Sequence, residues 1–248
     1  MRIYAIGDIH GQLEMLHDAY KKIAADREAC GDHTALVVHL GDYTDRGPES
    51  AKVIQTLIDG QKAGEPWTLL KGNHDRMFHG FVEDPEHHDA VLNNAGLTWL
   101  HPRLGGDKTL ESYGIAGTGR RSRRDLHKEA RDSVPQAHRD FLDALPLVHE
   151  TDDLLFVHAG IRPGIAVPDQ VEDDLIWIRE GFLEDDRDHG KLVVHGHTAL
   201  EEPTHFGNRV DIDTGAGYFR ALTVAVFEDC DCWILTEQGR VPLPPPSL

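Results

Sequence analysis

The run Gly41-Asp42-Tyr43-Thr44-Asp45-Arg46-Gly47 contains two carboxylates, an arginine and two glycines. It follows the apolar residues 35–40 and precedes a helix-like stretch that begins at Pro48. An apolar run followed at once by glycine and charged residues predicts a buried strand that opens into a loop. Proline at the start of the next segment favours the first turn of a helix. The pattern of strand, polar loop and helix is the repeating unit of an α/β fold.

Two similar transitions lie on either side of this run. Residues 7–11 (Gly-Asp-Ile-His-Gly) follow one short apolar run, and residues 72–75 (Gly-Asn-His-Asp) follow another. Asp8 and Asp42 are 34 residues apart, and Asp42 and Asn73 are 31 apart, which is the length of chain that a βαβ unit takes. Three such strands would carry their loops to one sheet edge, where open α/β sheets place their sites. The side chains expected at this edge are Asp8, His10, Asp42, Asp45, Arg46, Asn73 and His74.

Composition and charge narrow the possible functions. Of the 248 residues, 40% are hydrophobic and 27% are charged, as in soluble globular proteins. The 43 acidic and 25 basic residues give a net charge of −18, which argues against nucleic acid as a partner. A site for an anionic substrate therefore needs local positive charge, which metal ions could supply. The sequence has no apolar segment long enough for a membrane span, and its three cysteines lack a metal-binding spacing. We expect a cytoplasmic protein with free thiols and no membrane partner.

The remaining chain carries further strand and helix patterns. The sequence predicts one helix over 125–144, a hairpin of residues 147–150 and 154–157, a strand over 192–194, and short antiparallel strands over 203–236 with a turn at 215–217. His158 and His197 both lie just beyond the end of an apolar strand. We expect a single domain over residues 1–240, in which the glycine-rich segment 101–123 forms a lid or surface insertion, and a Pro-rich tail over 241–248.

Together these motifs resemble those of the bacterial phosphoprotein phosphatases, serine/threonine protein phosphatases within the calcineurin-like metallophosphoesterase superfamily. The residues that carry the resemblance are the runs 7–11, 41–47 and 72–75, with His158-Ala159-Gly160 and Gly196-His197-Thr198. They span residues 7–198 of the chain. The resemblance implies an α/β (α+β) fold: a four-layer αββα sandwich of two mixed β-sheets, with a two-metal site at one edge.

The resemblance also implies the ligands of two divalent metal ions. Asp8 and His10 would bind the first ion, Asp42 would bridge both, and Asn73, His158 and His197 would complete the second. Carboxylate, amide and imidazole groups suit Mn²⁺, Fe or Zn²⁺, and we expect Mn²⁺. His195 is an alternative to His197, because residues two apart in a strand face the same side. The family pattern places the ligand directly after glycine, which favours His197.

The same resemblance assigns roles in the reaction. A hydroxide that bridges the metal ions would attack phosphorus directly. His74 would protonate the departing oxygen as a general acid, and Asp45 would accept its other N–H. The phosphate oxygens would be held by Arg46, Arg179 and Asn73, the two arginines through their planar guanidinium groups.

Other features leave alternatives open. The basic cluster Arg120–Arg124 is either a solvated charge run or a contact for an acidic substrate. Asp75 stands where many members of the family carry glutamate. Tyr218 is a further candidate for the lining of the pocket, without support from a motif.

The expected function is a metal-dependent phosphomonoesterase, with phosphoserine or phosphothreonine in proteins as the main substrate and phosphotyrosine and small phosphate esters as secondary ones. The alternative is a symmetrical dinucleoside tetraphosphatase, a relative with the same metal ligands. The resemblance implies that this branch lacks an aspartate at the position of Asp45. Asp45 therefore favours esters, because an alkoxide leaving group needs a proton more than a phosphate leaving group does. A third interpretation is a binding module without catalytic activity. It is disfavoured because suitable residues fill all the positions of the metal ligands and of the general acid.

Overall fold

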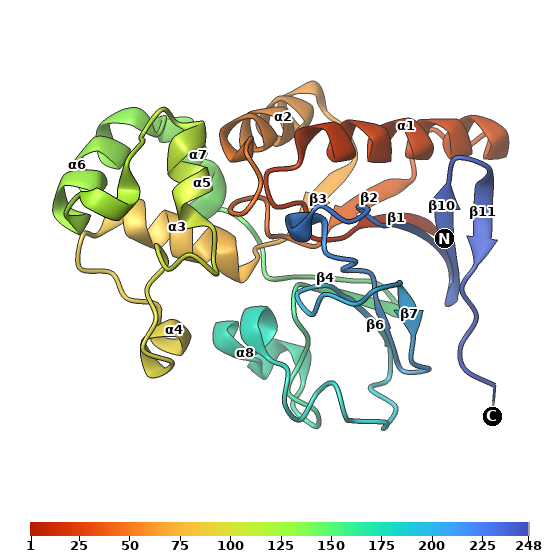
Figure 1. Cartoon of the computed structure of the whole chain (residues 1–248). Coiled ribbons are helices and arrows are strands. Elements are labelled where there is room, and N and C mark those ends of the chain that lie inside the picture. The colour runs from red at the N-terminus through yellow and green to blue at the C-terminus, as the bar shows by residue number, and fades with distance from the viewer. Residues whose placement is uncertain (248) are drawn as a thin grey trace.

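The computed structural model describes residues 1–247, and these form two β-sheets that face each other with helices on their outer sides (Figure 1). The first sheet has the strand order β11-β10-β9-β1-β2-β3, and the second has the order β4-β5-β6-β8-β7. The strands of the first sheet are β1 (Arg2–Ile6), β2 (Leu36–His39), β3 (Trp67–Leu69), β9 (Val224–Glu228), β10 (Asp231–Thr236) and β11 (Gly239–Pro242). Those of the second are β4 (Val148–Glu150), β5 (Leu154–Val157), β6 (Leu192–His195), β7 (Thr204–His205) and β8 (Arg209–Asp211).

Helices flank both sheets. Figure 1 shows α1 and α2 along the outer side of the first sheet, α8 beside the second sheet, and α3, α5, α6 and α7 gathered at one end. The α-helices are α1 (Leu13–Cys30), α2 (Ser50–Ala63), α3 (Asn73–Glu83), α4 (Ala90–Asn94), α5 (Gly106–Ser112), α6 (Arg123–Ser133), α7 (Gln136–Asp143) and α8 (Glu172–Trp177). Three short 3₁₀ turns accompany them: η1 (Thr118–Arg120), η2 (Val167–Asp169) and η3 (Ala216–Tyr218).

Strand β1 shows how the layers are stabilised. Tyr4 and Ile6 belong to the apolar cluster under α1 and α2, whereas Ile3 and Ala5 belong to the cluster between the two sheets. Successive side chains of a strand point to opposite faces, so one short apolar run serves both cores. A third cluster packs α8 against the outer face of the second sheet. The structure therefore has the layers helix, sheet, sheet and helix.

Both sheets are mixed. Strands β1, β2 and β3 are parallel, and β9 joins them antiparallel to β1. In the second sheet β5, β6 and β8 are parallel, while β4 and β7 pair antiparallel to their neighbours. The predicted sandwich of two mixed sheets with flanking helices is confirmed. The parallel strands matter most for function, because their carboxyl ends all open toward the same region between the sheets.

Two expectations about single elements are wrong. The helix predicted over residues 125–144 is divided into α6 and α7, because Pro135 cannot donate the hydrogen bond that a continuous helix needs. The turn at residues 215–217 does lie between two strands, β8 and β9, but these strands do not pair as the sequence predicts. Strand β8 lies in the second sheet and β9 in the first. Both strands direct apolar side chains into the core between the sheets, so their sequence pattern does not reveal that they lie in different sheets.

The two segments expected at the surface both make contacts with the fold. Within residues 101–123, helix α5 buries Leu110 and Thr109. The role of this segment as a lid stays a prediction. Of the residues assigned to the tail, Val241 and Pro242 belong to β11 and Leu243 packs against the core between the sheets.

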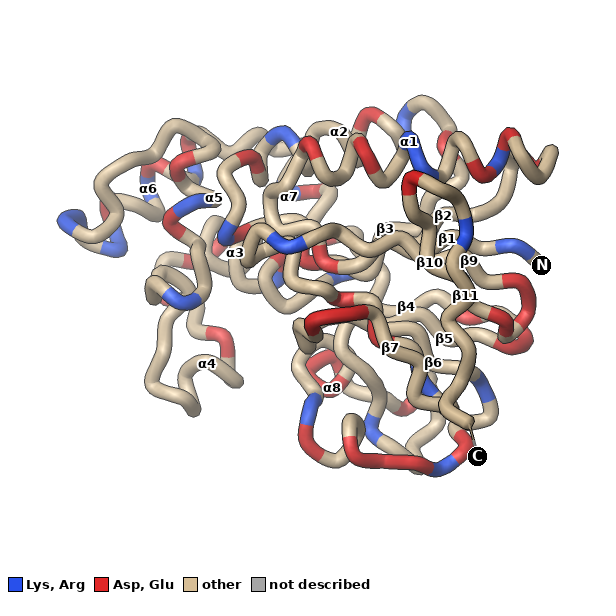
Figure 2. The backbone as a smooth tube through the Cα atoms, turned by 45° about the vertical axis from the view of Figure 1, so that its right-hand side comes forward, with Lys and Arg blue, Asp and Glu red and all other residues tan. Residues whose placement is uncertain are grey.

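Charge is distributed widely over the molecule. Figure 2 shows acidic residues along much of the chain, with basic residues among them, in keeping with the net charge of −18. No helix among residues 1–247 is both long enough and apolar enough to cross a membrane.

Candidate metal centre

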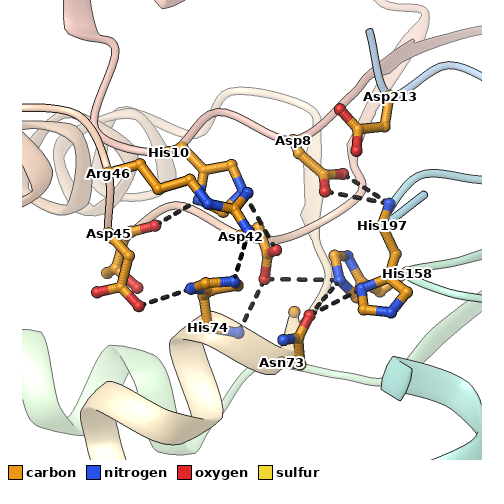
Figure 3. Close-up of polar contacts among 12 residues, drawn as sticks. Asp8, His10, Asp42, Asp45, Arg46, Asn73, His74, His158, His197 and Asp213 are labelled. Atoms are coloured by element: carbon orange, nitrogen blue, oxygen red, sulfur yellow. Dashed lines mark hydrogen bonds and ion pairs between the residues drawn. The ribbon is translucent and has the colours of Figure 1, made fainter. Parts of the chain in front are cut away.

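The polar loops of both sheets meet at one place. Their side chains come from the carboxyl ends of parallel strands, which in open α/β sheets is where sites are found. Asp8 and His10 follow β1, Asp42, Asp45 and Arg46 follow β2, Asn73 and His74 open α3 after β3, His158 follows β5, and His197 follows β6. Figure 3 shows these side chains pointing toward one another from loops that are far apart in the sequence. The structure therefore brings the predicted site residues together.

One group of possible metal donors consists of Asp42, His158 and His197. One donor atom from each lies within 4.8 Å of the others. Asn73 adds a fourth, because its Oδ1 atom is 3.0 Å from Nε2 of His158 and 2.9 Å from Nδ1 of His197. The Nδ1 atom of His158 donates to the carbonyl of Leu40 at 2.8 Å. A second partner of this kind fixes the ring and leaves Nε2 free as a ligand.

A second group consists of His10, Asp42 and His74, whose donor atoms also lie within 4.8 Å of one another. Nε2 of His10 is 3.5 Å from Oδ2 of Asp42, and Nδ1 of His10 donates to the carbonyl of Thr44 at 2.7 Å. Asp42 is thus common to both groups, with one oxygen facing His10 and the other facing His158. This is the arrangement expected of a carboxylate that bridges two cations.

Asp8 lies beside these groups and belongs to neither of the two found among the described residues. Its carboxylate accepts the backbone N–H of His197 at 3.1 Å. A Cβ atom at residue 196 would collide with Oδ1 of Asp8, so the glycine before His197 lets the two loops approach. Asp213 lies next to Asp8 (Figure 3) and contributes to raising the pKa of its carboxyl group. Sequence reasoning missed Asp213, which follows a short strand without a recognisable motif.

The electrostatics of the centre favour cations. Burial, with the charges of Asp213 and Asp42, raises the pKa of Asp8 well above its usual range, and burial raises the pKa of Asp42 to about 7. Burial also lowers the pKa of His158 to about 4 and that of His197 well below its usual range. The imidazoles are therefore neutral, the form that binds metals. Carboxylates crowded together in a buried place are stabilised by positive charge between them.

The convergence and chemistry of the donors test the fit of a metal ion. Nε2 of His158 and Nδ1 of His197 both face Oδ1 of Asn73. Carboxylate, amide and neutral imidazole donors suit divalent ions such as Mn²⁺, Fe²⁺ and Zn²⁺. The residues present therefore fit a divalent metal centre.

Backbone strain is concentrated at the same place. Among residues 1–247, seven residues other than glycine have a positive φ. Five of them are site residues: His10, Asp42, Asp45, Arg46 and His197. Such conformations cost of order 1–3 kcal/mol each and tend to gather at functional sites. The surrounding structure thus holds these loops in conformations that their own residues disfavour. This concentration of strain supports a functional role for the site.

His74 and Asp45 form a buried pair beside the metal donors. The Nδ1 atom of His74 lies 2.6 Å from Oδ2 of Asp45. Two residues that the sequence did not single out hold the carboxylate: Thr109 donates to Oδ1 at 2.7 Å and Trp99 donates to Oδ2 at 2.8 Å. Both come from a part of the chain more than fifty residues away, so no local pattern could have indicated them.

The two arginines predicted to hold phosphate also lie at the centre. Arg46 contacts Nε2 of His10, and its Nη2 atom is 3.1 Å from Nε2 of His74. Arg179 donates to the carbonyl of His197 at 3.1 Å. Burial lowers its pKa, and the carboxylates of Asp42 and Asp8 act in the opposite direction. Both guanidinium groups are therefore near the shared carboxylate.

His195 and the basic cluster lie outside this arrangement. His195 is fully buried, its Nδ1 atom is 3.1 Å from the carbonyl of Gly196, and its ring packs against Phe182. In the cluster Arg120–Arg124, Arg121 pairs with Glu129 and Arg123 donates to the carbonyl of Pro85. These contacts serve the local fold.

Comparison with known proteins agrees with this geometry. The sequence profile of the calcineurin-like phosphoesterases (Metallophos) matches residues 1–226. The chain belongs to this family. It is a phosphoesterase of the hydrolase class, and the family implies divalent metal ions, which the donor groups around Asp42 fit.

This calcineurin-like phosphoesterase is similar to several proteins with named activities and to several solved structures. A bis(5'-nucleosyl)-tetraphosphatase PrpE [asymmetrical] of Oceanobacillus iheyensis is 25% identical, over 92% of this chain and 90% of its own length. The protein of the same name from Geobacillus thermodenitrificans is 26% identical, over 90% and 89%. Among solved structures, a candidate diadenosine tetraphosphatase has a TM-score of 0.62 at 20% identity, over 98% of this chain and 93% of its own. A cold-active protein-tyrosine phosphatase of a Shewanella species has a TM-score of 0.64 at 15% identity, over 98% and 80%. At these identities the structures indicate the fold alone.

Proposed function

We propose that the protein is a metal-dependent hydrolase of bis(5'-nucleosyl) tetraphosphates. The observation that carries the reaction type is Asp42, whose two oxygens face two different groups of buried donors. The substrate class is supported by the name of the relatives, which this chain matches over about nine tenths of both lengths. The geometry therefore supports metal-dependent phosphoryl chemistry, and the similarity favours a phosphoanhydride with nucleosides at both ends.

In this proposal one ion would be held by His10, Asp42 and Asp8. The other would be held by Asp42, Asn73, His158 and His197. We expect Mn²⁺ in both positions. When bound, two divalent cations would neutralise phosphoryl oxygens and lower the pKa of a water at the centre. Asp42 is fixed for this role by the backbone N–H of His74, which donates to its Oδ1 atom at 2.9 Å. A Cβ atom at Gly72 would collide with that same oxygen, so glycine is needed at this position.

Arg46 and Arg179 would bind the phosphoryl oxygens. In the structure Arg46 donates to Nε2 of His74, so this nitrogen carries no proton in that arrangement. A phosphate group would draw the guanidinium of Arg46 toward its own oxygens and free Nε2. The negative charge of the phosphate would also favour the protonated imidazole of His74. His74 could then donate the Nε2 proton to the leaving oxygen, with Asp45 holding the ring through Nδ1.

The His74–Asp45 pair supports a second candidate, a phosphomonoesterase that acts on phosphoserine or phosphothreonine in proteins. An alkoxide leaves far less readily than a phosphate, so an ester gains more from a positioned acid. The pair is present and fully buried, as a phosphoprotein phosphatase would require. We place this candidate second because the named relatives that match nearly the whole chain are tetraphosphatases.

The two candidates are separated by parallel assays of the Mn²⁺-loaded protein. One assay contains diadenosine tetraphosphate and the other a phosphothreonine peptide, with products separated by chromatography. We expect a higher kcat/KM for the nucleotide. Asymmetrical cleavage gives AMP and ATP, as the name of the relatives suggests, whereas symmetrical cleavage gives two molecules of ADP. Hydrolysis of the peptide alone would contradict the proposal. Asp42→Asn, which removes the shared carboxylate, serves as the inactive control.

A further inference from the structure

A cavity of about 450 Å³ opens beside Arg46, within the range of about 300–1,000 Å³ typical of small-molecule sites. One wall is the segment from Pro102 to Lys108, and the other is the turn η3 with Gly217 and Tyr218. The proposed metal ligands do not line it. It is a separate compartment that shares Arg46 with the metal centre.

In each wall of the cavity a glycine packs against Arg46: Gly105 in one wall and Gly217 in the other. The carbonyl of Gly105 accepts the backbone N–H of Arg46 at 3.2 Å. On the other side, a Cβ atom at Gly217 would lie 2.6 Å from Cδ2 of His10 and 2.8 Å from Cδ of Arg46. Any larger residue would push the turn away from the metal donors. Arg46 therefore links the cavity to the place where phosphoryl groups would bind.

The lining of this cavity is basic, in contrast to the whole chain. Arg46, Arg103 and Lys108 contribute three positive charges against the single negative charge of Asp107. Lys108 also contacts Glu111, and both side chains of this pair are nearly half exposed. An exposed pair of this kind is worth little, so Lys108 remains available to an anion. The cavity thus concentrates positive charge in a protein with a net charge of −18.

The cavity lining also includes an exposed aromatic ring. Tyr218 is 56% exposed, and the guanidinium carbon of Arg46 lies 4.8 Å from the centre of its ring. The next residue, Phe219, is 70% exposed and has a left-handed backbone with φ of 61°. Bulky residues rarely adopt this conformation, and such strain is found at ligand clamps. A planar ring beside clustered cations suits a ligand that joins an aromatic base to phosphates.

We propose that this cavity binds one nucleoside polyphosphate arm of the substrate, with the base on Tyr218 and the phosphates between Arg103, Lys108 and Arg46. The inference rests on the function proposed above and adds which residues recognise the nucleotide. An acidic or phosphorylated peptide could also be attracted by the cations. The ring of Tyr218 favours the nucleotide, because base–aromatic stacking adds affinity that phosphate contacts alone do not provide.

The test compares two inhibitors that differ only by a nucleoside. Hydrolysis of para-nitrophenyl phosphate by the Mn²⁺-loaded protein is measured with ATP or inorganic tripolyphosphate as the inhibitor, at constant free Mn²⁺. We expect ATP to inhibit the wild type more strongly than tripolyphosphate. In Tyr218→Ala the advantage of ATP should fall by about 5-fold to 150-fold, the range of base–aromatic stacking. Tyr218→Phe, which keeps the ring, should retain it.

The cations are tested in the same assay. Arg103→Ala should weaken inhibition by ATP and by tripolyphosphate to the same degree, because it removes a phosphate contact. Arg124→Ala removes an exposed arginine elsewhere and should change neither constant. The ratio of the two constants within one variant cancels any general loss of activity.

The outcomes separate this inference from the proposed function. Equal inhibition by both compounds in the wild type, or an unchanged ratio in Tyr218→Ala, would overturn the nucleotide pocket. If the ratio falls as expected while diadenosine tetraphosphate is not hydrolysed, the pocket stands and the proposed substrate is wrong. If the tetraphosphate is hydrolysed and the ratio does not fall, the proposed function stands and this pocket does not bind the base.

Discussion

The Nδ1 atom of His74 lies 2.6 Å from Oδ2 of Asp45, and both side chains are buried beside the metal donors. The carboxylate fixes the orientation of the ring, so that Nε2 faces the region of Arg46. Burial raises the pKa of Asp45, whereas Thr109 and Trp99 act against this by hydrogen bonds to the carboxylate. The pair is therefore built to hold a histidine in one orientation, which is what a positioned acid requires.

Replacing His74 by asparagine should lower turnover of para-nitrophenyl phosphate by at least about 10²-fold, the lower bound for a positioned acid. The metal content should stay at the wild-type value, because on our assignment His74 is not a metal ligand. Steady-state kinetics and elemental analysis of the same preparation check both points. Wild-type turnover, or loss of an ion from His74→Asn, would show that the residue has another role.

Thr109→Val should reduce kcat more than it changes KM. Valine has the shape of threonine but cannot donate to Oδ1 of Asp45 or accept the backbone N–H of Asp45, which lies at 2.7 Å. Each unpaired buried group costs about 1–3 kcal/mol in stability, so the melting temperature should also fall.

The control for this prediction is Thr109→Ser, which keeps the hydroxyl group. It should restore most of kcat in the same assay. If the valine and serine variants have the same kcat, the hydroxyl does not act through Asp45.

Substitution of a proposed metal ligand should lower the number of bound ions per chain, and the loss should be greater for Asp42 than for a ligand of one ion. Asp42→Asn removes the shared carboxylate and should weaken the binding of both ions. His158→Ala removes a donor from one group only and should cost one ion. Elemental analysis after gel filtration measures the ions per chain. His149→Gln, a change in β4 outside both donor groups, is the matched control and should keep the full metal content. Equal metal loss in the first two variants would contradict a bridging role for Asp42.

Chelation should destabilise the fold as well as stop activity. The charge of Asp213 helps to raise the pKa of both Asp8 and Asp42, and that of Asp42 helps to raise the pKa of Asp8. A bound cation relieves this repulsion. Removal of metal by EDTA should lower the melting temperature, and added Mn²⁺ should restore it in a concentration-dependent manner. Calorimetry checks this, and an unchanged melting temperature would argue against metal binding by the native fold.

His39 should make stability depend on pH in the acid range. Its ring is fully buried in β2, where burial lowers the pKa from 6.5 to about 3. Between these values the unfolded chain binds a proton that the folded chain does not. The stabilisation is therefore complete above about pH 6.5 and falls by about 1.4 kcal/mol for each pH unit below it.

The variant His39→Gln tests this. Glutamine can accept the hydroxyl hydrogen of Tyr20, which lies 2.9 Å from Nε2 of His39, but it does not titrate. The free energy of unfolding, measured between pH 7 and 5 by denaturant titration, should then decline less steeply than in the wild type. His33→Gln changes an exposed histidine and should leave the slope as it is. An unchanged slope in His39→Gln would rule out this histidine as the cause.

Much of the fold and most of the candidate centre could be predicted because their signals are local. Asp8, Asp42 and Asn73 each follow a short apolar strand, and such transitions can be recognised within ten residues of sequence. The parallel order of β1, β2 and β3 follows from the spacing between those transitions. The roles of the ligands came from the resemblance to a known family, and they stay predictions.

What could not be predicted depends on contacts between distant segments. Thr109 and Trp99 reach Asp45 from the part of the chain around α5, and Asp213 reaches Asp8 from the far end of the chain. Nothing in the sequence near these residues indicates their partners. The same holds for the link between β8 and β9, because an apolar strand that faces a shared core fits either sheet.

The donors of the metal centre sit at strand ends, whereas the basic cavity is built from two connections, residues 102–108 and the turn after β8. Gly105 and Gly217 tie these connections to Arg46 and His10, and the other residues of the connections can change separately from the donors. An insertion away from these two glycines would alter which molecules fit while the reactive groups keep their positions. In such a scaffold one set of catalytic residues could acquire new substrates through changes in the connections. Residues 102–108 and the turn after β8 are therefore the first places to alter in order to change substrate specificity.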